Sequence, residues 1–262
     1  MNLSEGRDVG RLEAFAAAAG DELLDLHADP HHHRSVLTLI GEEAPRAVAT
    51  VALELLDLRE HSGAHPRLGV VDVVPFVALA GSSAGDAVAA RDAFSSWLAF
   101  EHGVPCFRYG PERSLPEVRR QAFRELTPDV GPRAPHATAG AAAVGARPIL
   151  VAYNVWLAGS DVAMARQVAA QVRGDGVRAL GLAVGPRAQV SMNLIEPARV
   201  GPAAAYDRVR AAANQLGASV AGTELVGLLP HAVLAAVDEG RWTELDLSPD
   251  RTIEARLGWR PA

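Results

Sequence analysis

Lysine is the residue type that this sequence lacks altogether, since all 25 of its basic residues are arginine. Schiff-base and pyridoxal-phosphate enzymes need a lysine amine, and P-loop nucleotide sites need a lysine charge beside the phosphates. Both classes of protein are therefore excluded unless a partner supplies the lysine. Carboxylate recognition must also fall to arginine, to hydroxyl groups or to backbone amides.

Cysteine is almost as scarce, because Cys106 is the single one and no intrachain disulfide can form. It lies in a short apolar run at residues 104–109 that predicts a buried strand. We therefore expect an inert core thiol rather than a nucleophile. No apolar run approaches the roughly 18–20 residues of a membrane span, and no signal-peptide pattern opens the sequence. These absences favour a soluble, cytoplasmic protein.

The charge balance points away from polyanionic partners. The formal net charge is −6 and the isoelectric point is near 5.8. Nucleic acids and anionic membranes recruit basic surfaces, so neither is an expected partner. The length of 262 residues suffices for one large domain or two small ones.

The second half of the sequence has the clearer element pattern. Its hydrophobic periodicity predicts a β-α-β-β-α-β order, which is the ferredoxin-like split unit. The first half, from strand 22–28 to strand 104–108, fits a similar order. We therefore predict an α/β protein, an α+β sandwich of two ferredoxin-like βαββαβ subdomains, at residues 1–149 and 150–262. The second-half elements are strand 148–157, helix 161–173, strands 177–184 and 189–195, helix 202–217 and strand 219–227.

The first half is predicted to contain more elements, followed by an irregular segment at 127–147. Proline and glycine interrupt that segment, and long irregular stretches inside a compact protein are usually functional or linkers. Pro75 places a strand edge, a bulge or a strand end at its position. The predicted elements are helix 7–19, strands 22–28 and 35–41, helix 44–58, strand 69–79, helix 84–102, strand 104–109 and helix 115–126.

The densest group of chemically active residues lies at 61–76, HSGAHPRLGVVDVVPF, where His61, His65, Arg67 and Asp72 surround a turn before a strand. Side chains at the mouth of a strand are held firmly yet can meet a ligand. A neutral imidazole near its ordinary pKa is the best-matched general base at neutral pH. A surface turn with incidental histidines fits the same pattern equally well.

A second group, DLHADPHHHR at 25–34, contains His27 and three consecutive histidines. Adjacent turn residues point in divergent directions, so a metal site is less favoured than a polar loop in which Arg34 or a histidine meets an anion. Arg34 and Arg67 are candidates for binding a carboxylate, because a guanidinium does so with two parallel hydrogen bonds. Near the start of the chain, Ser4 is a candidate N-cap of the first helix, and amides there could bind a carboxylate.

The third group lies in the irregular segment, at GPRAPHATAG. Glycine and other small residues let the backbone approach a flat heterocycle such as a pterin. The stretch lacks the GxGxxG spacing after a strand, so it gives no support for a dinucleotide fold. Its residues are Gly131, Pro132, Arg133, Ala134, Pro135, His136, Ala137, Thr138, Ala139 and Gly140.

Taken in order, these segments resemble the glutamate formiminotransferase (formimidoyltransferase) family. The resemblance covers nearly the whole chain, and the strings that carry it are NLSEGRD, LLDLHADPHHHRSVLTLIG, GAHPRLGVVDVVPF, GVPCFRYG, DVGPRAPHATAGAAAVGARPILVAYNVWL, QVSMNLI and ELVGLLP. It implies two α/β subdomains with a folate cleft between them. It also implies formimidoyl transfer between glutamate and tetrahydrofolate in histidine degradation, with 5-formimidoyltetrahydrofolate as the loaded co-substrate and no metal, pyridoxal phosphate or nucleotide.

By the same resemblance, the catalytic histidine falls on His65 and the folate-contacting stretch on residues 131–140. Asn2, Ser4, His27, Arg34 and Arg67 fall among the expected substrate contacts. The chain ends with the family's first module, so no cyclodeaminase domain is expected, and the resemblance also implies a homodimer.

The sequence departs from the family pattern at three places. The family's first strand, which usually ends Cys-Val-Pro-Asn-Phe-Ser-Glu-Gly, is cut here to residues 1–6, MNLSEG, which implies a truncated start or a missing edge piece. Ala64 replaces the acidic residue that commonly precedes the catalytic histidine, so another group must orient His65. His33 and His27 replace an asparagine and an acidic residue. These replacements keep two alternatives open: a formimidoyltransferase acting on a different amine, such as glycine or a specialised metabolite, and a non-catalytic protein that binds reduced folate.

Overall fold

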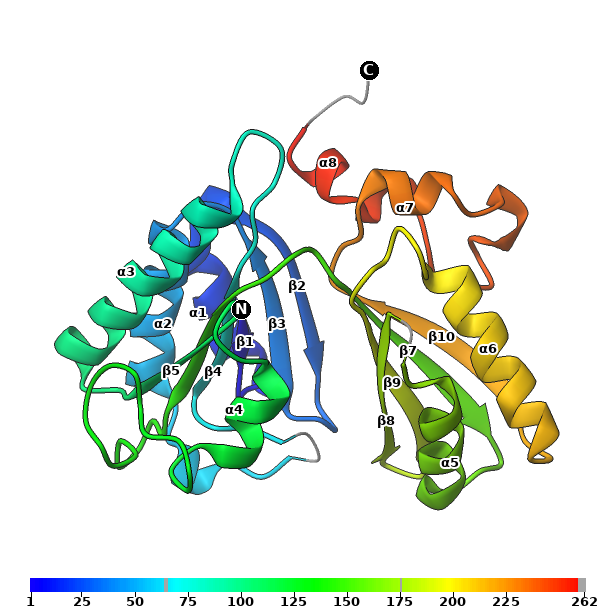
Figure 1. Ribbon diagram of the computed structural model, residues 1–262, viewed down its shortest axis with the longest axis horizontal. Coiled ribbons are helices and arrows are strands. Elements are labelled where there is room, and N and C mark those ends of the chain that lie inside the picture. The colour runs from blue at the N-terminus through cyan, green and yellow to red at the C-terminus, as the bar shows by residue number, and fades with distance from the viewer. Residues whose placement is uncertain (64–65, 175, 259–262) are drawn as a thin grey trace. The chain divides into compact units, whose positions relative to one another are not determined.

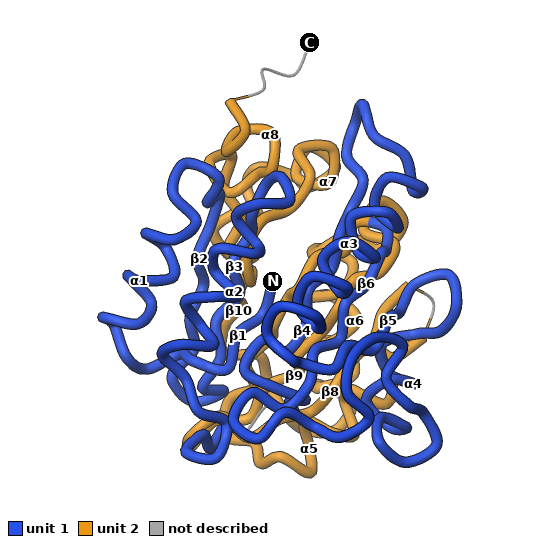
Figure 2. Tube along the Cα trace, turned by 90° about the vertical axis from the view of Figure 1, so that its left-hand side faces the viewer, with its two compact units in different colours: residues 1–148 blue, residues 149–262 orange. Residues whose placement is uncertain are grey.

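The computed structural model describes residues 1–63, 66–174 and 176–258, which divide into two compact units, 1–148 and 149–262 (Figure 2). Each unit has one mixed or antiparallel sheet with helices packed on it (Figure 1). The predicted α/β class with two sheets is confirmed. In the described part of the chain no helix is long and apolar enough to cross a membrane.

The second unit has the ferredoxin-like order predicted for it. Its four strands are arranged β10-β7-β9-β8, all antiparallel, and helices α5 and α6 pack on one face. That face is apolar because every second strand residue, such as Tyr153 and Val190, joins the core with the helices. The elements are β7 (Val151–Ala158), α5 (Val162–Val172), β8 (Val177–Val184), β9 (Arg187–Leu194), α6 (Pro202–Gln215), β10 (Ser219–Val226), α7 (His231–Ala235) and α8 (Ile253–Arg256).

The first unit contains the same arrangement with two strands added. Its sheet order is β2-β3-β1-β4-β6-β5, in which the first four positions repeat the ferredoxin-like order and β5 and β6 lie parallel beside β4. The elements are β1 (Asn2–Leu3), α1 (Val9–Ala19), β2 (Leu23–Asp29), β3 (Arg34–Leu39), α2 (Glu43–Leu55), β4 (Val71–Phe76), α3 (Ala84–His102), β5 (Cys106–Tyr109), α4 (Leu115–Gln121) and β6 (Ala142–Ala146).

Three expectations for this unit were wrong. The ferredoxin-like part begins at β1 and ends at β4, not at strands 22–28 and 104–108. The alternative of a missing edge piece was wrong, because the short first strand, β1, lies inside the sheet between β3 and β4. The segment 127–147 is not irregular throughout, since its last residues form β6, which is buried along its whole length between β4 and β5.

Local signals explain where the helices begin and end. Helix α3 starts at a capping box formed by Ser83 and Asp86, and it ends at Gly103 in the left-handed conformation. Pro75 lies one residue before the end of β4, which confirms a strand end and not an edge. Cys106 is buried in β5, and burial raises the pKa of its thiol to about 12, so the expected inert thiol is confirmed.

Candidate functional site

Asp72 organises the segment that carries the predicted base. Its side chain is fully buried at the start of β4. One carboxylate oxygen accepts hydrogen bonds from Arg34 and from Arg119 Nη2, the latter at 2.7 Å, and the other accepts from the backbone N–H of Leu68 at 2.6 Å. Burial opposes ionisation, but the two guanidinium groups outweigh it and lower the pKa of Asp72 to about 2. The carboxylate therefore stays charged and links β3, α4 and the segment before β4.

The same segment, residues 61–70, is held at both ends. Arg67 donates to the carbonyl oxygens of Gly63 at 3.1 Å and His61 at 3.2 Å. Arg119 Nη1 donates to Pro66 O at 3.0 Å. His65 lies outside the described residues, so its placement is not part of the geometry. The described residues before and after positions 64–65 are therefore bound to arginine side chains of this unit.

Two glycines bring segment 61–70 against the end of the predicted folate stretch. Gly69 and Gly140 form a β-bridge, and Ala141 N donates to Leu68 O at 3.1 Å. A Cβ atom at Gly69 would lie 2.3 Å from the carbonyl oxygen of Ala141, so no larger residue fits there without a backbone shift. The sequence pattern did not show this contact, which joins two of the three predicted groups.

The predicted folate stretch is a turn closed by His136. Its backbone exchanges hydrogen bonds with Gly140 at 2.8 and 2.9 Å, and its Nδ1 atom accepts from the N–H groups of Thr138 and Ala139. Thr138 O in turn accepts from Leu58 N at 2.7 Å. Residues 131–135 are exposed, whereas Ala139 and Gly140 are buried. The exposed part is available to a ligand, and the buried part fixes the turn to segment 61–70.

A cluster of Glu5, His33 and His61 lines a small cavity of about 40 Å³ beside the same segment. The Glu5 carboxylate accepts from the backbone N–H groups of Gly6 and Arg7, both at 2.8 Å, and from Arg11 Nη1 at 3.0 Å. Burial opposes its ionisation, yet these hydrogen bonds outweigh it and lower the pKa of Glu5. The cavity therefore has a charged carboxylate in its wall.

The two imidazole rings of this cluster stack with centroids 4.1 Å apart. His33 Nδ1 accepts from Gly6 N at 3.2 Å, and His61 Nε2 donates to the carbonyl oxygen of His33 at 2.8 Å. Burial lowers the pKa of both rings, and each ring is further disfavoured as a cation by nearby positive charge. The lowered pKa values favour the neutral form of both rings, and the carbonyl acceptor places the proton of His61 on Nε2.

The three consecutive histidines diverge as predicted. His31 is exposed, whereas the ring of His32 is buried with Nδ1 3.6 Å from Asp29 Oδ2, and His33 reaches Glu5. Among the described residues, no group of three or more histidine, cysteine, aspartate or glutamate side chains could hold a metal ion.

The remaining predicted contacts lie on the same sheet. Asn2 and His27 are partly buried on β1 and β2, and both pair with Val36 of β3. Arg34 binds the internal carboxylate of Asp72. Ser4 is not the N-cap of α1: Asp8 is, accepting from Arg11 N, while the Ser4 hydroxyl donates to Gly69 O at 2.8 Å. The serine was misassigned because Asp8 is an equally good cap closer to the helix.

Sequence reasoning missed Arg119 and Glu5. Arg119 lies in the predicted helix 115–126 without any local signal of its function, and only the folded chain brings it to Asp72. Glu5 lies inside the string NLSEGRD, directly before the first helix. Its carboxylate accepts hydrogen bonds from the N–H groups of the next three residues, and a carboxylate at such a position is a recognisable local signal.

Comparison with known proteins adds to this geometry. Residues 1–147 match the family described as the formiminotransferase domain, N-terminal subdomain, and residues 152–242 match the formiminotransferase domain. The glutamate formimidoyltransferase of Streptococcus pyogenes serotype M1 is 34% identical over 91% of this chain and 90% of its own length. That of Thermoplasma acidophilum is 32% identical over 90% and 88%. The formimidoyltransferase-cyclodeaminase of Rattus norvegicus is 33% identical, over 89% of this chain and 50% of that protein.

Proposed function

The chain belongs to the formiminotransferase family, and from that premise we propose that it moves a formimidoyl group between N-formimidoyl-L-glutamate and tetrahydrofolate, with His65 as general base. It is an enzyme that transfers one-carbon groups. The observation that carries the choice of donor is the 34% identity with a glutamate formimidoyltransferase over 91% of the chain.

The chemistry needs one proton carrier and no covalent nucleophile. The N5 amine of tetrahydrofolate attacks the formimidoyl carbon and gives up its proton to His65, forming a C–N bond and a tetrahedral intermediate. The intermediate then breaks its bond to the glutamate nitrogen, which takes the proton back from the histidine. The products are 5-formimidoyltetrahydrofolate and glutamate. A single imidazole serves both transfers, so the absence of lysine is no obstacle.

The described geometry supports this assignment through the residues around His65. Arg67 and Arg119 donate to the carbonyl oxygens of Gly63 and Pro66, and Asp72 accepts from the N–H of Leu68, so the described residues before and after positions 64–65 are anchored. The exposed part of residues 131–140 is proposed to contact the folate, and Asn2, Ser4, His27, Arg34 and Arg67 to shape the substrate site.

The test is His65→Ala, assayed spectroscopically with tetrahydrofolate and N-formimidoyl-L-glutamate. We expect kcat to fall by about 10²–10⁴-fold with little change in KM. His231→Ala in the second unit is the matched control, and it should retain wild-type turnover. Near wild-type kcat in the folded His65 variant would overturn the assignment of the base.

The same assay separates the alternatives. Transfer from another formimidoyl amine, such as formimidoylglycine, in preference to the glutamate compound would identify a different amine substrate. Binding of reduced folate without transfer from any donor would identify a binding protein. Cytoplasmic location and assembly as a homodimer are further parts of the proposal, and cell fractionation and light scattering test them.

A further inference from the structure

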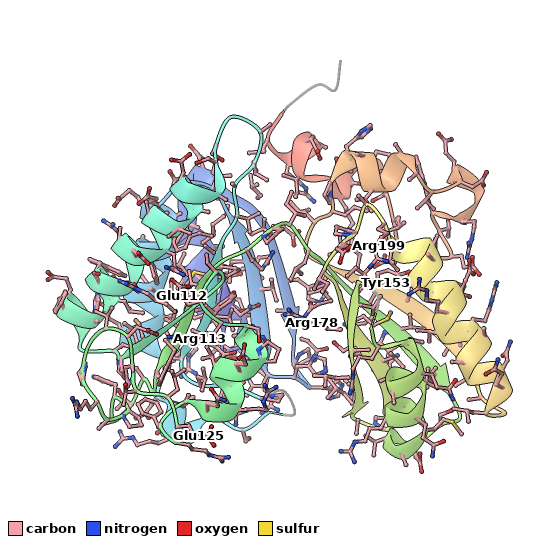
Figure 3. All side chains as sticks on the ribbon, viewed as in Figure 1. Glu112, Arg113, Glu125, Tyr153, Arg178 and Arg199 are labelled. Atoms are coloured by element: carbon pink, nitrogen blue, oxygen red, sulfur yellow. The ribbon has the colours of Figure 1, made fainter. Side chains whose placement is uncertain are left out.

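The second unit buries polar side chains on the sheet face opposite α5 and α6. On β7, β9 and β10 this face presents Asn154, Trp156, Gln189, Ser191 and Glu224, which we call the polar face. Strand alternation places these residues opposite the core residues, and Figure 3 shows the same division with Tyr153 on the helix side and Arg178 on the other. Asn154 is 5% exposed and Gln189 is fully buried. A buried amide pair on a sheet face calls for a chemical explanation.

Glu224 lies at the centre of this group. Its Oε2 atom accepts from Asn154 Nδ2 at 2.9 Å and from Gln189 Nε2 at 3.4 Å. The other end of the Gln189 amide, Oε1, is buried and accepts no hydrogen bond from the described residues. A buried amide oxygen without a donor is costly and rare in a folded protein. The cluster thus combines the Glu224 carboxylate with the Gln189 amide oxygen, which can still accept a hydrogen bond from an N–H donor.

The neighbouring positions provide a flat surface and space. Trp156 pairs with Gln189 across the strands, and the Arg187 guanidinium stacks on its indole ring 4.1 Å from the centroid. Gly222 pairs with Trp156 from the other side, where an added Cβ atom would meet nothing within 4 Å. An aromatic ring beside an unfilled position is a feature of sites that take planar ligands.

We propose that Glu224 and Gln189 recognise the pyrimidine edge of the reduced pterin of the folate co-substrate. That edge carries a ring N–H next to an amino group, which are adjacent donors matched to a carboxylate and an amide oxygen. This inference rests on the proposed function, because it identifies the residues that hold the pterin in the same reaction. No covalent step is involved, and both side chains are binding residues.

The primary test is Glu224→Gln, measured by anaerobic calorimetry with 6-methyltetrahydropterin, which is the ring half of the co-substrate. The isosteric amide still offers an oxygen to Asn154 and Gln189, so the fold is retained, but the negative charge is removed. We expect binding to weaken by about 10- to 100-fold, as for the loss of a charge-assisted hydrogen bond. Glu239→Gln, at an exposed carboxylate of the same unit, is the matched control and should bind like wild type.

Two further variants keep the test independent of folding. Gln189→Met preserves volume and removes the unpartnered acceptor, so it should weaken pterin binding without lowering the melting temperature. Gly222→Leu places a side chain beside Trp156, where the protein itself offers no clash, and should also block the pterin. The probe p-aminobenzoylglutamate, which is the other half of the co-substrate, should bind all variants like wild type.

The outcomes separate this inference from the proposed function. Pterin affinity within twofold of wild type in Glu224→Gln overturns the inference, as does a raised KM for formimidoylglutamate with unchanged pterin affinity. Weakened pterin binding in a protein that transfers no formimidoyl group overturns the proposed function alone. A wild-type chain that binds neither reduced folate nor the pterin overturns both.

Discussion

Replacement of Asp72 by asparagine tests the reasoning about the segment around the proposed base most directly. The change keeps the shape of the side chain and removes one negative charge. It leaves the guanidinium groups of Arg34 and Arg119, which are 12% and 21% exposed, beside a neutral amide. The backbone N–H of Leu68 also loses a charged acceptor.

Two estimates set the range of the expected magnitude. Lowering the pKa of Asp72 from 3.8 to about 2 corresponds to roughly 2.4 kcal/mol, at about 1.36 kcal/mol for each pH unit. Removing one partner from a buried ion pair costs about 3–5 kcal/mol. We therefore expect Asp72→Asn to reduce the free energy of unfolding of the first unit by about 2–5 kcal/mol, together with most of the transfer activity.

The pH dependence follows from the direction of the pKa change. Because the pKa of Asp72 is depressed in the folded state, its ionisation stabilises the protein at every pH above the unfolded value near 4. This stabilisation is lost as the pH falls through about 2. The difference between wild type and Asp72→Asn should therefore be constant at neutral pH and shrink between pH 4 and pH 2.

Hydrogen–deuterium exchange of β4 amides measures this stability, with β7 amides in the same sample as an internal reference. Asp207→Asn is the matched control, since Asp207 also binds two arginines, Arg210 and Arg241, but is 42% exposed. For this control the β7 amides report the stability of its own unit and the β4 amides serve as the reference, and its loss should stay below about 1 kcal/mol. A loss of less than about 1 kcal/mol for Asp72→Asn, or one equal to that of the control, would refute the reasoning.

Further predictions concern the backbone, the thiol and the imidazoles. Gly69→Ala should lower the melting temperature and abolish transfer, because the added Cβ atom would lie within 2.4 Å of two carbonyl oxygens. Gly85→Ala, in the first turn of α3, is the control and should raise stability by about 0.5–1 kcal/mol. Equal melting temperatures for the two variants would contradict the steric argument. Cys106 should react with a thiol reagent at pH 8 only on unfolding, since burial raises its pKa to about 12, and rapid labelling of the native chain would disprove it. His33 and His61 should titrate below pH 6.5 in NMR measurements, because burial lowers the pKa of both rings. Protonation therefore favours the unfolded chain, and stability should decrease as the pH falls below 6.5. A titration midpoint above pH 6.5 for either ring would contradict the burial argument.

The sequence predicted the elements best where periodicity was strong. Helix 84–102 and strand 177–184 were placed to the residue, because each has clear ends and one consistent buried face. Strand β6 was missed because its residues, AAVGA, carry little strand preference. Packing on both faces explains their small size, since the ring of Tyr109 lies where a Cβ atom at Gly145 would be.

The sequence allowed candidate site residues to be proposed one by one, but it did not predict how they assemble. The groups at 61–76, 25–34 and 131–140 were each recognised from composition and turn chemistry. Their mutual contacts depend on pairs far apart in the chain, such as Asp72 with Arg119, and one sequence contains no signal for such pairs. Strand β1 was indicated by the family resemblance and not by periodicity, because two residues have no period and form a strand only through their neighbours.

The position of β6 also has a consequence for biosynthesis. This strand comes last in the sequence of its unit, yet it separates β4 from β5 and pairs with both. While the ribosome has not yet released residue 146, β4 keeps an unpaired edge and β5 has no strand to join. If translation pauses before that point, each nascent chain exposes the unpaired edges of β4 and β5, and such edges can pair with those of other chains and cause aggregation. Pauses in translation that come after β6 has left the ribosome, rather than before, should therefore favour soluble expression of this unit.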